Sequence, residues 1–267
     1  MPHITVNGTR MYYEDHGEGP ETIVFAHGLL WSGQMFEPQV AALKGQYRCI
    51  TVDHRGQGQS EIAADGYDID TLTEDIVALI QALDCGPCHF VGLSMGGFMG
   101  LRLGFRYPEL LRSLILLETS ADPESPESAK KYKMLNIIAR LLGLGLVANQ
   151  TMTIMFGQKF LNDSARADLK QTLRQRLVGN HRIGITRAVA GVVARDGVYD
   201  KIRQITIPTL IIVGDQDVAT PVEKSERIHS QIANSQLHII PGAGHTSTLE
   251  EPEAVTAAIS NFLSILR

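Results

Sequence analysis

The chain has 267 residues, of which 44% are hydrophobic, and its net charge at pH 7 is −5. This length and composition predict one large globular domain, or a core with a modest insertion. The acidic balance and the lack of a basic cluster argue against a nucleic-acid partner.

Three features indicate the cellular setting. The N-terminal sequence "MPHITVNGTRMYYEDHG" lacks the charged leader and the apolar stretch of a signal peptide. The most apolar window, 137–157, is interrupted by Arg140, Gly143 and Gly145, whereas a membrane span needs about 20 mostly apolar residues. We therefore expect no membrane partner. The three cysteines, without a secretory signal, favour a reducing cytoplasm.

Short apolar runs alternate with longer helical patterns, which predicts a doubly wound α/β fold. The expected strands are 3–7, 10–15, 22–26, 47–52, 88–92, 113–118, 209–213 and 236–240. The first two should form a hairpin around Asn7-Gly8, and the others are typical of buried parallel strands. The expected helices are 35–44, 70–84, 95–106, 222–233 and 252–265. Together they predict a mostly parallel, eight-stranded sheet with helices on both faces.

Residues 122–200 interrupt this alternation because they contain no convincing strand. Helical patterns cover 127–142, 144–157, 164–178 and 182–195. A stretch of about 80 residues is too long for a loop in a compact domain. We therefore predict a core made of 1–121 and 201–267, with a helical insertion, 122–200, between two strands of the sheet.

The sequence "CGPC" at 85–88 forms a C-x-x-C motif. A redox motif of this kind opens a helix after a strand, whereas here a helical pattern precedes it and a strand begins at Cys88. Gly-Pro in this context is typical of a turn. A lone C-x-x-C is not a zinc site, and the chain has no H-E-x-x-H motif. We expect neither a metal nor an organic cofactor.

The sequence "HFVGLSMGGFMG" places Ser94 between an apolar strand and a helical pattern. "GLSMG" fits the G-x-S-x-G motif of a nucleophile elbow, in which a strained turn exposes the serine hydroxyl above the sheet. Gly92 and Gly96 would avoid collisions across so tight a turn. A plain glycine-rich turn and a phosphate cradle are the alternatives, but no phosphate-loop motif is present. Ser94 is therefore the candidate nucleophile.

A serine nucleophile needs a base. Of nine histidines, His245 lies directly after a predicted strand and before the last helix. Loops at the carboxyl ends of strands carry the ligand chemistry of such sheets. His245 is therefore the candidate base.

The histidine in turn needs a carboxylate. Asp217 follows the strand 209–213 and gives the chain order Ser–Asp–His that is typical of this motif. Asp215 and Glu118 stay open as alternative acids.

Negative charge on the tetrahedral intermediate needs hydrogen-bond donors. The backbone N–H of Met95, directly after the nucleophile, is one candidate. The loop "HGLLWSGQMF" should supply the second, and we assign it to Leu29 N–H.

The combination of "FAHGLL", "VDHRGQGQS", "VGLSMGG", "GDQDVATP" and "GAGHTSTLEEPE" resembles the α/β-hydrolase superfamily over the whole chain except the insertion. Within it, the sequence is similar to the group of 3-oxoadipate enol-lactonases, small carboxylesterases, acyl-homoserine lactonases and cofactor-free perhydrolases. The resemblance implies Ser94, Asp217 and His245 as the catalytic residues, with Leu29 and Met95 at the oxyanion. It also implies that the insertion is a helical cap over the active site.

Two details restrict the branch of the superfamily. Epoxide hydrolases and haloalkane dehalogenases carry aspartate at the elbow, where this chain has Ser94. Leu30 stands where the familiar oxyanion loop has proline, which argues against a perhydrolase. "DHRGQGQS" is expected to be structural, with Asp53 and Arg55 pinning the loop and glycines at its bends.

The cap should provide part of an apolar pocket, because ligand sites are mostly apolar with a few polar groups. Met155 and Phe156 are the candidate cap contacts, and Trp31 is the candidate wall on the core side. Methionine adapts to varied shapes, so we expect short-to-medium acyl substrates.

These observations predict a serine hydrolase that cleaves a small carboxylic ester or lactone through an acyl-enzyme. A peroxide-using perhydrolase and a non-catalytic ligand receptor on the same fold are the alternatives. The sequence leaves the oligomeric state open, a homodimer included.

Overall fold

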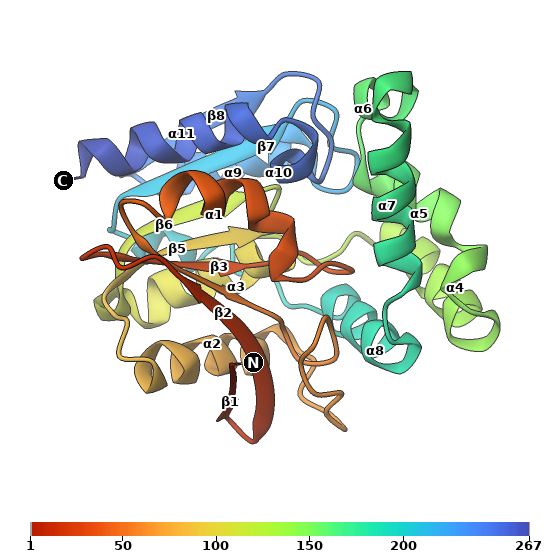
Figure 1. Ribbon diagram of the computed structural model, residues 1–267, viewed down its shortest axis with the longest axis horizontal. Coiled ribbons are helices and arrows are strands. Elements are labelled where there is room, and N and C mark those ends of the chain that lie inside the picture. The colour runs from red at the N-terminus through yellow and green to blue at the C-terminus, as the bar shows by residue number, and fades with distance from the viewer. Residues whose placement is uncertain (1, 267) are drawn as a thin grey trace.

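The computed structural model describes residues 2–266, which form an eight-stranded sheet in the order β1-β2-β4-β3-β5-β6-β7-β8 (Figure 1). The strands are β1 (His3–Val6), β2 (Thr9–His16), β3 (Thr22–Ala26), β4 (Arg48–Val52), β5 (Cys88–Leu93), β6 (Leu111–Leu117), β7 (Thr209–Gly214) and β8 (Ser235–Ile240). Strand β2 pairs antiparallel with β1 and β4, and the other neighbours are parallel. The predicted mostly parallel, eight-stranded sheet is confirmed.

The first two strands form the predicted hairpin. Asn7 and Gly8 both have positive φ, 46° and 73°, which is the backbone of a type I′ turn. Val6 is therefore paired with Thr9 across the turn.

The sheet buries both of its faces. Successive side chains of a strand point to opposite sides, so Ile23 and Phe25 of β3 join one core while Val24 and Ala26 join the other. Helices α1 (Glu37–Leu43) and α11 (Pro252–Ile265) cover the first core, and α2 (Ile69–Ala82), α3 (Met95–Arg106) and α9 (Val222–Gln231) cover the second. A short helix, α10 (Ser247–Glu250), precedes α11. This sandwich explains why the strands read as continuous apolar runs.

The residues between β6 and β7 fold into helices, as predicted. They are α4 (Pro126–Leu142), α5 (Ala148–Met155), α6 (Gln158–Asn162), α7 (Ala167–Val178) and α8 (Arg182–Val193). They lie at one end of the sheet in Figure 1, although β6 and β7 are neighbours within it.

Two details of the insertion differ from the prediction. The expected helix 144–157 is shorter, because Gly143, with φ 103°, ends α4 and the 3₁₀ turn Leu144–Leu146 precedes α5. Helix α6 has no counterpart among the predicted elements. The other 3₁₀ helices are Gly33–Phe36, Pro108–Leu110, Ser164–Arg166 and Ile202–Gln204.

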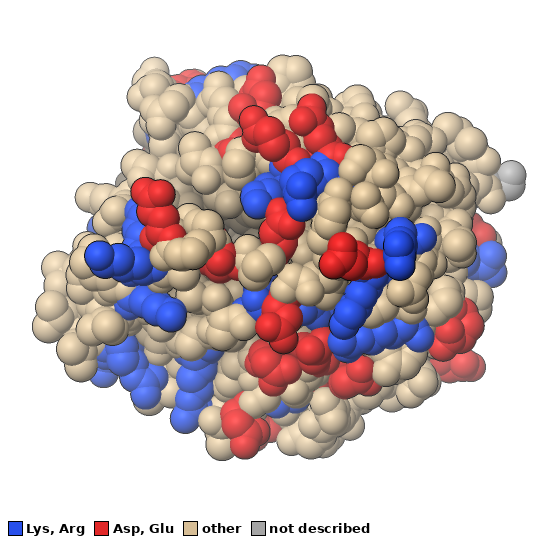
Figure 2. Space-filling model, turned by 180° about the vertical axis from the view of Figure 1, so that it is seen from behind, with Lys and Arg blue, Asp and Glu red and all other residues tan. Residues whose placement is uncertain are grey.

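Charged side chains tie the start of the insertion to the core. Asp122 accepts hydrogen bonds from Lys224 Nζ at 2.7 Å and from Arg227 Nη2 at 3.2 Å, both on α9. Acidic and basic side chains lie side by side in several places on the face seen in Figure 2. None of the helices formed by residues 2–266 has both the length and the apolar character that crossing a bilayer requires.

The "CGPC" segment is a turn, as predicted. Cys88 opens β5 and Cys85 follows α2. Both thiols are free and buried, and burial raises the pKa of Cys85 to about 11. A thiol with so high a pKa is a poor nucleophile at neutral pH.

Candidate active site

Ser94 lies on a strained turn between β5 and α3. Its φ of 51° and ψ of −106° are unusual for a residue with a side chain. A Cβ on Gly92 would collide with the backbone of Gly96, and one on Gly96 would collide with the carbonyl of Ala26 in β3. The turn therefore requires glycine on both sides, and the second collision is with the neighbouring strand, not across the turn. The carbonyl of Leu117 accepts a hydrogen bond from Ser94 N–H at 2.8 Å and fixes the turn to β6.

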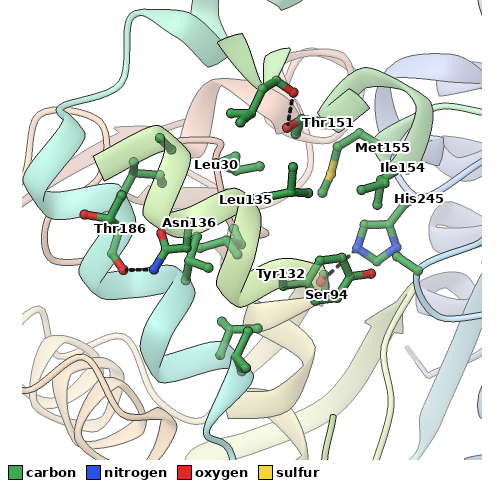
Figure 3. A pocket seen from close by; sticks show the side chains of 18 of the residues that line it. Leu30, Ser94, Tyr132, Leu135, Asn136, Thr151, Ile154, Met155, Thr186 and His245 are labelled. Atoms are coloured by element: carbon green, nitrogen blue, oxygen red, sulfur yellow. Dashed lines mark hydrogen bonds between the residues drawn. The ribbon is translucent and has the colours of Figure 1, made fainter. Parts of the chain in front are cut away.

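The structure brings Ser94, His245 and Asp217 into one hydrogen-bonded chain. Ser94 Oγ lies 2.9 Å from His245 Nε2 (Figure 3). His245 Nδ1 lies 2.8 Å from Asp217 Oδ2. All three side chains are buried, with 8% of Ser94 and 4% of each of the other two exposed. The carboxylate can hold the Nδ1–H tautomer, which leaves Nε2 free to accept the serine proton.

The carboxylate of Asp217 is fixed by its own loop. Its Oδ1 accepts the N–H groups of Ala219 at 2.8 Å and Thr220 at 3.0 Å, and its Oδ2 accepts the Thr220 hydroxyl at 2.8 Å. Asp215 has another role, because it is exposed and accepts a hydrogen bond from Gly242 N–H at 2.6 Å. Of these two aspartates, Asp217 is the one that contacts His245.

Glu118, the third candidate acid, lies directly after β6 and is fully buried. Burial, and next the negative charge of Asp217, raise its pKa well above the ordinary value. We find no hydrogen bond from Glu118 to His245 among the described residues. A carboxyl whose pKa is raised by burial and by a neighbouring negative charge favours its neutral form, which makes it a weak partner for an imidazolium.

Two backbone N–H groups beside Ser94 are free to bind an oxyanion. Within residues 2–266, neither Leu29 N–H nor Met95 N–H donates a hydrogen bond to the protein. Met95 is the first residue of α3, where the helix dipole adds partial positive charge. Leu29 and Ser94 line the same pocket, and a Cβ on Gly28 would lie 3.5 Å from Ser94 Cβ.

The loop around Leu29 is held in an uncommon conformation. Leu30 has φ 76°, which proline cannot adopt because its ring fixes φ near −65°. The absence of proline at this position therefore has a conformational basis. Gln57 Oε1 accepts a hydrogen bond from Leu30 N–H at 2.9 Å and stabilises the loop.

Sequence reasoning missed Gln57 and a second support, His27. Its Nδ1 donates to the carbonyl of Gly28 at 2.7 Å, while its Nε2 accepts His54 N–H at 3.0 Å. Burial lowers the pKa of both histidines, so both rings are neutral. Their position in loops at this sheet edge was visible in the sequence, but their hydrogen bonds were not.

The "DHRGQGQS" loop is pinned as predicted. Asp53 accepts the N–H groups of Gly33 at 2.7 Å and Gln59 at 2.8 Å. Arg55 donates two hydrogen bonds, of 2.7 and 2.6 Å, to the carboxylate of Asp75. The loop therefore holds Gln57 in place beneath the candidate oxyanion site.

Glu250 was also missed by sequence reasoning. This fully buried carboxylate accepts the N–H groups of Gly244 at 3.0 Å and Thr246 at 3.1 Å, which flank His245. It also accepts Gly157 N–H, from the insertion, at 2.8 Å. Burial raises the pKa of Glu250 to about 7 despite these donors. One side chain thus links the loop of His245 to the segment after α5.

A pocket with an empty volume of about 910 Å³, its mouth included, opens over Ser94 and His245. The core contributes Leu29 and Phe98. The insertion contributes a mostly apolar wall that includes Leu135, Leu144, Val147, Ile154, Met155 and Ile185. Figure 3 shows Met155 and Ile154 on the side of His245, with Tyr132 beside Ser94.

Of the three predicted pocket residues, Met155 lines the pocket, but Trp31 and Phe156 do not. Their rings pack edge to face at 5.9 Å in the core, and Phe156 also stacks on Phe160 at 4.8 Å. The prediction for Trp31 and Phe156 was wrong because the sequence does not show which way a side chain turns in a loop, where Trp31 lies, or just beyond a helix end, where Phe156 lies in extended backbone.

The described residues contain no group of three or more His, Cys, Asp or Glu side chains that could hold a metal ion. What the site offers is a serine hydroxyl, an imidazole, a buried carboxylate and free backbone donors. These groups suit nucleophilic attack on a carbonyl carbon.

The family model described as "alpha/beta hydrolase fold" matches residues 21–252. A 3-oxoadipate enol-lactonase of Acinetobacter baylyi is 33% identical over 93% of this chain and 92% of its own. A putative non-heme chloroperoxidase of Synechocystis is 30% identical over 98% of this chain and all of its own. The structure of a thermophilic esterase from Thermogutta terrifontis has a TM-score of 0.91 at 27% identity, covering 99% of this chain and 98% of that one. By sequence and by fold, the chain belongs to the α/β-hydrolase family.

Proposed function

We propose that this enzyme of the α/β-hydrolase family cleaves a carboxylic ester or lactone through an acyl-enzyme. The observation that carries the proposal is the hydrogen-bonded chain Ser94–His245–Asp217 at the base of an apolar pocket. Relatives named as an enol-lactonase and an esterase support the same class of substrate.

In the proposed mechanism, Ser94 Oγ attacks the carbonyl carbon while His245 Nε2 takes its proton. Asp217 stabilises the imidazolium that forms. The N–H groups of Leu29 and Met95 donate to the oxyanion, because both are free and lie beside the serine. The imidazolium then protonates the leaving alcohol. Water, deprotonated by His245, releases the acid from Ser94.

The pocket supports short-to-medium acyl groups. The flexible thioether of Met155 in its wall can adapt to several acyl shapes. Residues of α4, α5 and α8 line the pocket, and we expect poor action on long-chain triglycerides.

A perhydrolase is the second candidate, because a relative is named as a non-heme chloroperoxidase. It would use the same residues with peroxide as the acyl acceptor. Peroxide-dependent bromination of a dye at a rate exceeding ester hydrolysis would favour it. Tight ligand binding without turnover would instead indicate a receptor.

A panel of p-nitrophenyl esters and small lactones of increasing acyl length tests the proposal. We expect turnover that is highest for short-to-medium chains and nearly absent in Ser94→Ala, since the remaining groups retain only a small residue of catalysis. Met155→Ala should shift the preferred length. Activity that persists in Ser94→Ala, or a preference for long chains, would contradict the proposal.

A further inference from the structure

The pocket contains a single pair of charged side chains. Among its described lining residues, Glu124 and Arg195 are the only Asp, Glu, Lys or Arg. Arg195 Nη1 lies 2.9 Å from Glu124 Oε2. The side chains are 5% and 13% exposed, so water screens this pair little. The positive charge of Arg195 is therefore already neutralised inside the pocket.

Arg195 is held firmly in this arrangement. Nη1 also donates to the carbonyl of Val192 at 2.9 Å, and Nε donates to the carbonyl of Asp122 at 3.3 Å. Its guanidinium lies 4.2 Å from the ring centroid of Phe98, one turn beyond Ser94 on α3. Turning towards a ligand would break several of these contacts at once.

Apart from the backbone N–H groups assigned to the oxyanion, the polar side chains near Ser94 do not favour an anion. Burial raises the pKa of Tyr132 to about 12, so its hydroxyl is neutral. This hydroxyl makes no hydrogen bond within the described residues, and Figure 3 shows Tyr132 beside Ser94. The acidic residues behind the site, Asp217, Glu118 and Glu250, are each either negative or neutral, so none of them attracts an anion. A neutral polar group can bind Tyr132, but a carboxylate finds no free Lys or Arg among the described residues that line the pocket.

We infer that this pocket selects uncharged esters or lactones and rejects substrates that carry a carboxylate. A carboxylate entering the pocket loses its water without gaining a counter-ion. Displacing Glu124 from Arg195 would leave Glu124 buried and unpaired, which is similarly unfavourable. The inference rests on the proposed function and specifies its substrate class.

A matched pair of esters tests this selection: p-nitrophenyl hexanoate and mono-p-nitrophenyl adipate, which differ in a terminal methyl or carboxylate. In the wild type, we expect kcat/KM for the adipate ester to be lower than for the hexanoate ester by a factor of about 100 or more. Glu124→Gln keeps the side-chain shape but frees the charge of Arg195. It should raise the adipate-to-hexanoate ratio by at least about tenfold.

Two controls make the result specific to the pair. Glu127→Gln removes an exposed charge in the first turn of α4, outside the pocket, and should leave the ratio at the wild-type value. The double variant Glu124→Gln/Arg195→Gln should lose the gain. Comparable kcat/KM for both esters in the wild type, or an unchanged ratio in Glu124→Gln, would overturn the inference. The wild-type ratio decides the matter even if Glu124→Gln does not fold.

Binding to Ser94→Ala, measured by calorimetry with the same two esters, separates this inference from the proposed function. Tighter binding of the hexanoate ester supports charge selection even if the wild type turns over neither ester. Such a lack of turnover would refute the proposed hydrolysis but not the charge selection. Equal binding of the two esters refutes the selection even where hydrolysis is found.

Discussion

Asp215 and Asp217 follow the same strand, two residues apart, yet they have different partners. Asp217 contacts His245, whereas Asp215 accepts Gly242 N–H. The difference arises from the loop, in which Ala219 and Thr220 turn their N–H groups towards Asp217. The pair offers a matched test of the acid.

Asp217→Asn should lower kcat on the order of 10⁴, because an amide facing Nδ1 favours the wrong imidazole tautomer. Asp215→Asn should have a small effect, since Asp215 is exposed and far from the proton transfer. Steady-state kinetics of both variants on one ester checks this prediction. A larger loss in Asp215→Asn would move the acid to Asp215, and mild losses in both would point to Glu118.

At the residue scale, the sequence predicted the candidate catalytic residues that lie in a recognisable motif or at a strand end. Ser94 and His245 were recognisable by their place at strand ends, and the structure brings them to hydrogen-bonding distance. The contacts of Gln57 with Leu30 N–H and of Glu250 with Gly157 N–H could not be predicted, because these partners are distant in the chain. Trp31 was misplaced because a sequence does not show which way an isolated aromatic side chain turns.

At the scale of elements, Glu250 of α10 connects three segments through one carboxylate. Its carboxylate oxygens accept N–H groups from the loop around His245 and from the junction between α5 and α6. Thr246 adds a second link, since its hydroxyl donates to the carbonyl of Met155 at 2.8 Å. The wall of the pocket and the proposed base are therefore positioned together.

Glu250→Gln should change how stability depends on pH. The folded-state pKa of about 7 lies above the ordinary value of 4.5 for a glutamate, so the protonated form is favoured by folding. Wild-type stability should therefore fall as pH rises from about 4.5 to about 7, by up to roughly 3 kcal/mol. Glutamine cannot ionise and should lack this decline.

Thermal unfolding of both proteins between pH 4.5 and 8 checks this expectation. Glu253→Gln, an exposed glutamate in the first turn of α11, is the control and should follow the wild type. A difference in Tm between wild type and Glu250→Gln that does not vary with pH would contradict the account.

We also expect kcat of Glu250→Gln to fall by about tenfold, because a loosened loop misplaces His245.

Elements with strong local signals were predicted well from the sequence. The local sequence alone specifies the Asn7-Gly8 turn and the buried apolar strands. Within the insertion, the helix predicted at 127–142 ends where expected, before Gly143. The short α6 was not anticipated, because a five-residue helix is too short to show a periodic pattern.

At the scale of the whole molecule, the parallel sheet gathers groups that are distant in sequence. Ser94, Asp217 and His245 follow β5, β7 and β8, whose carboxyl ends lie along one edge. The insertion extends from the same edge and contributes most of the pocket wall. The fold thus places the proposed reaction centre beneath an apolar wall. The order of the strands predicted the proximity of the three residues, and the resemblance to the α/β-hydrolase superfamily implied the wall above them.

The central claim is that an ester substrate acylates Ser94. The most direct measurement is mass spectrometry of the protein after an acid quench during turnover of p-nitrophenyl hexanoate. The account predicts a hexanoyl adduct on the peptide that contains Ser94, and no adduct in Ser94→Ala. Turnover without a covalent adduct in the wild type, or an adduct on another residue, would contradict it.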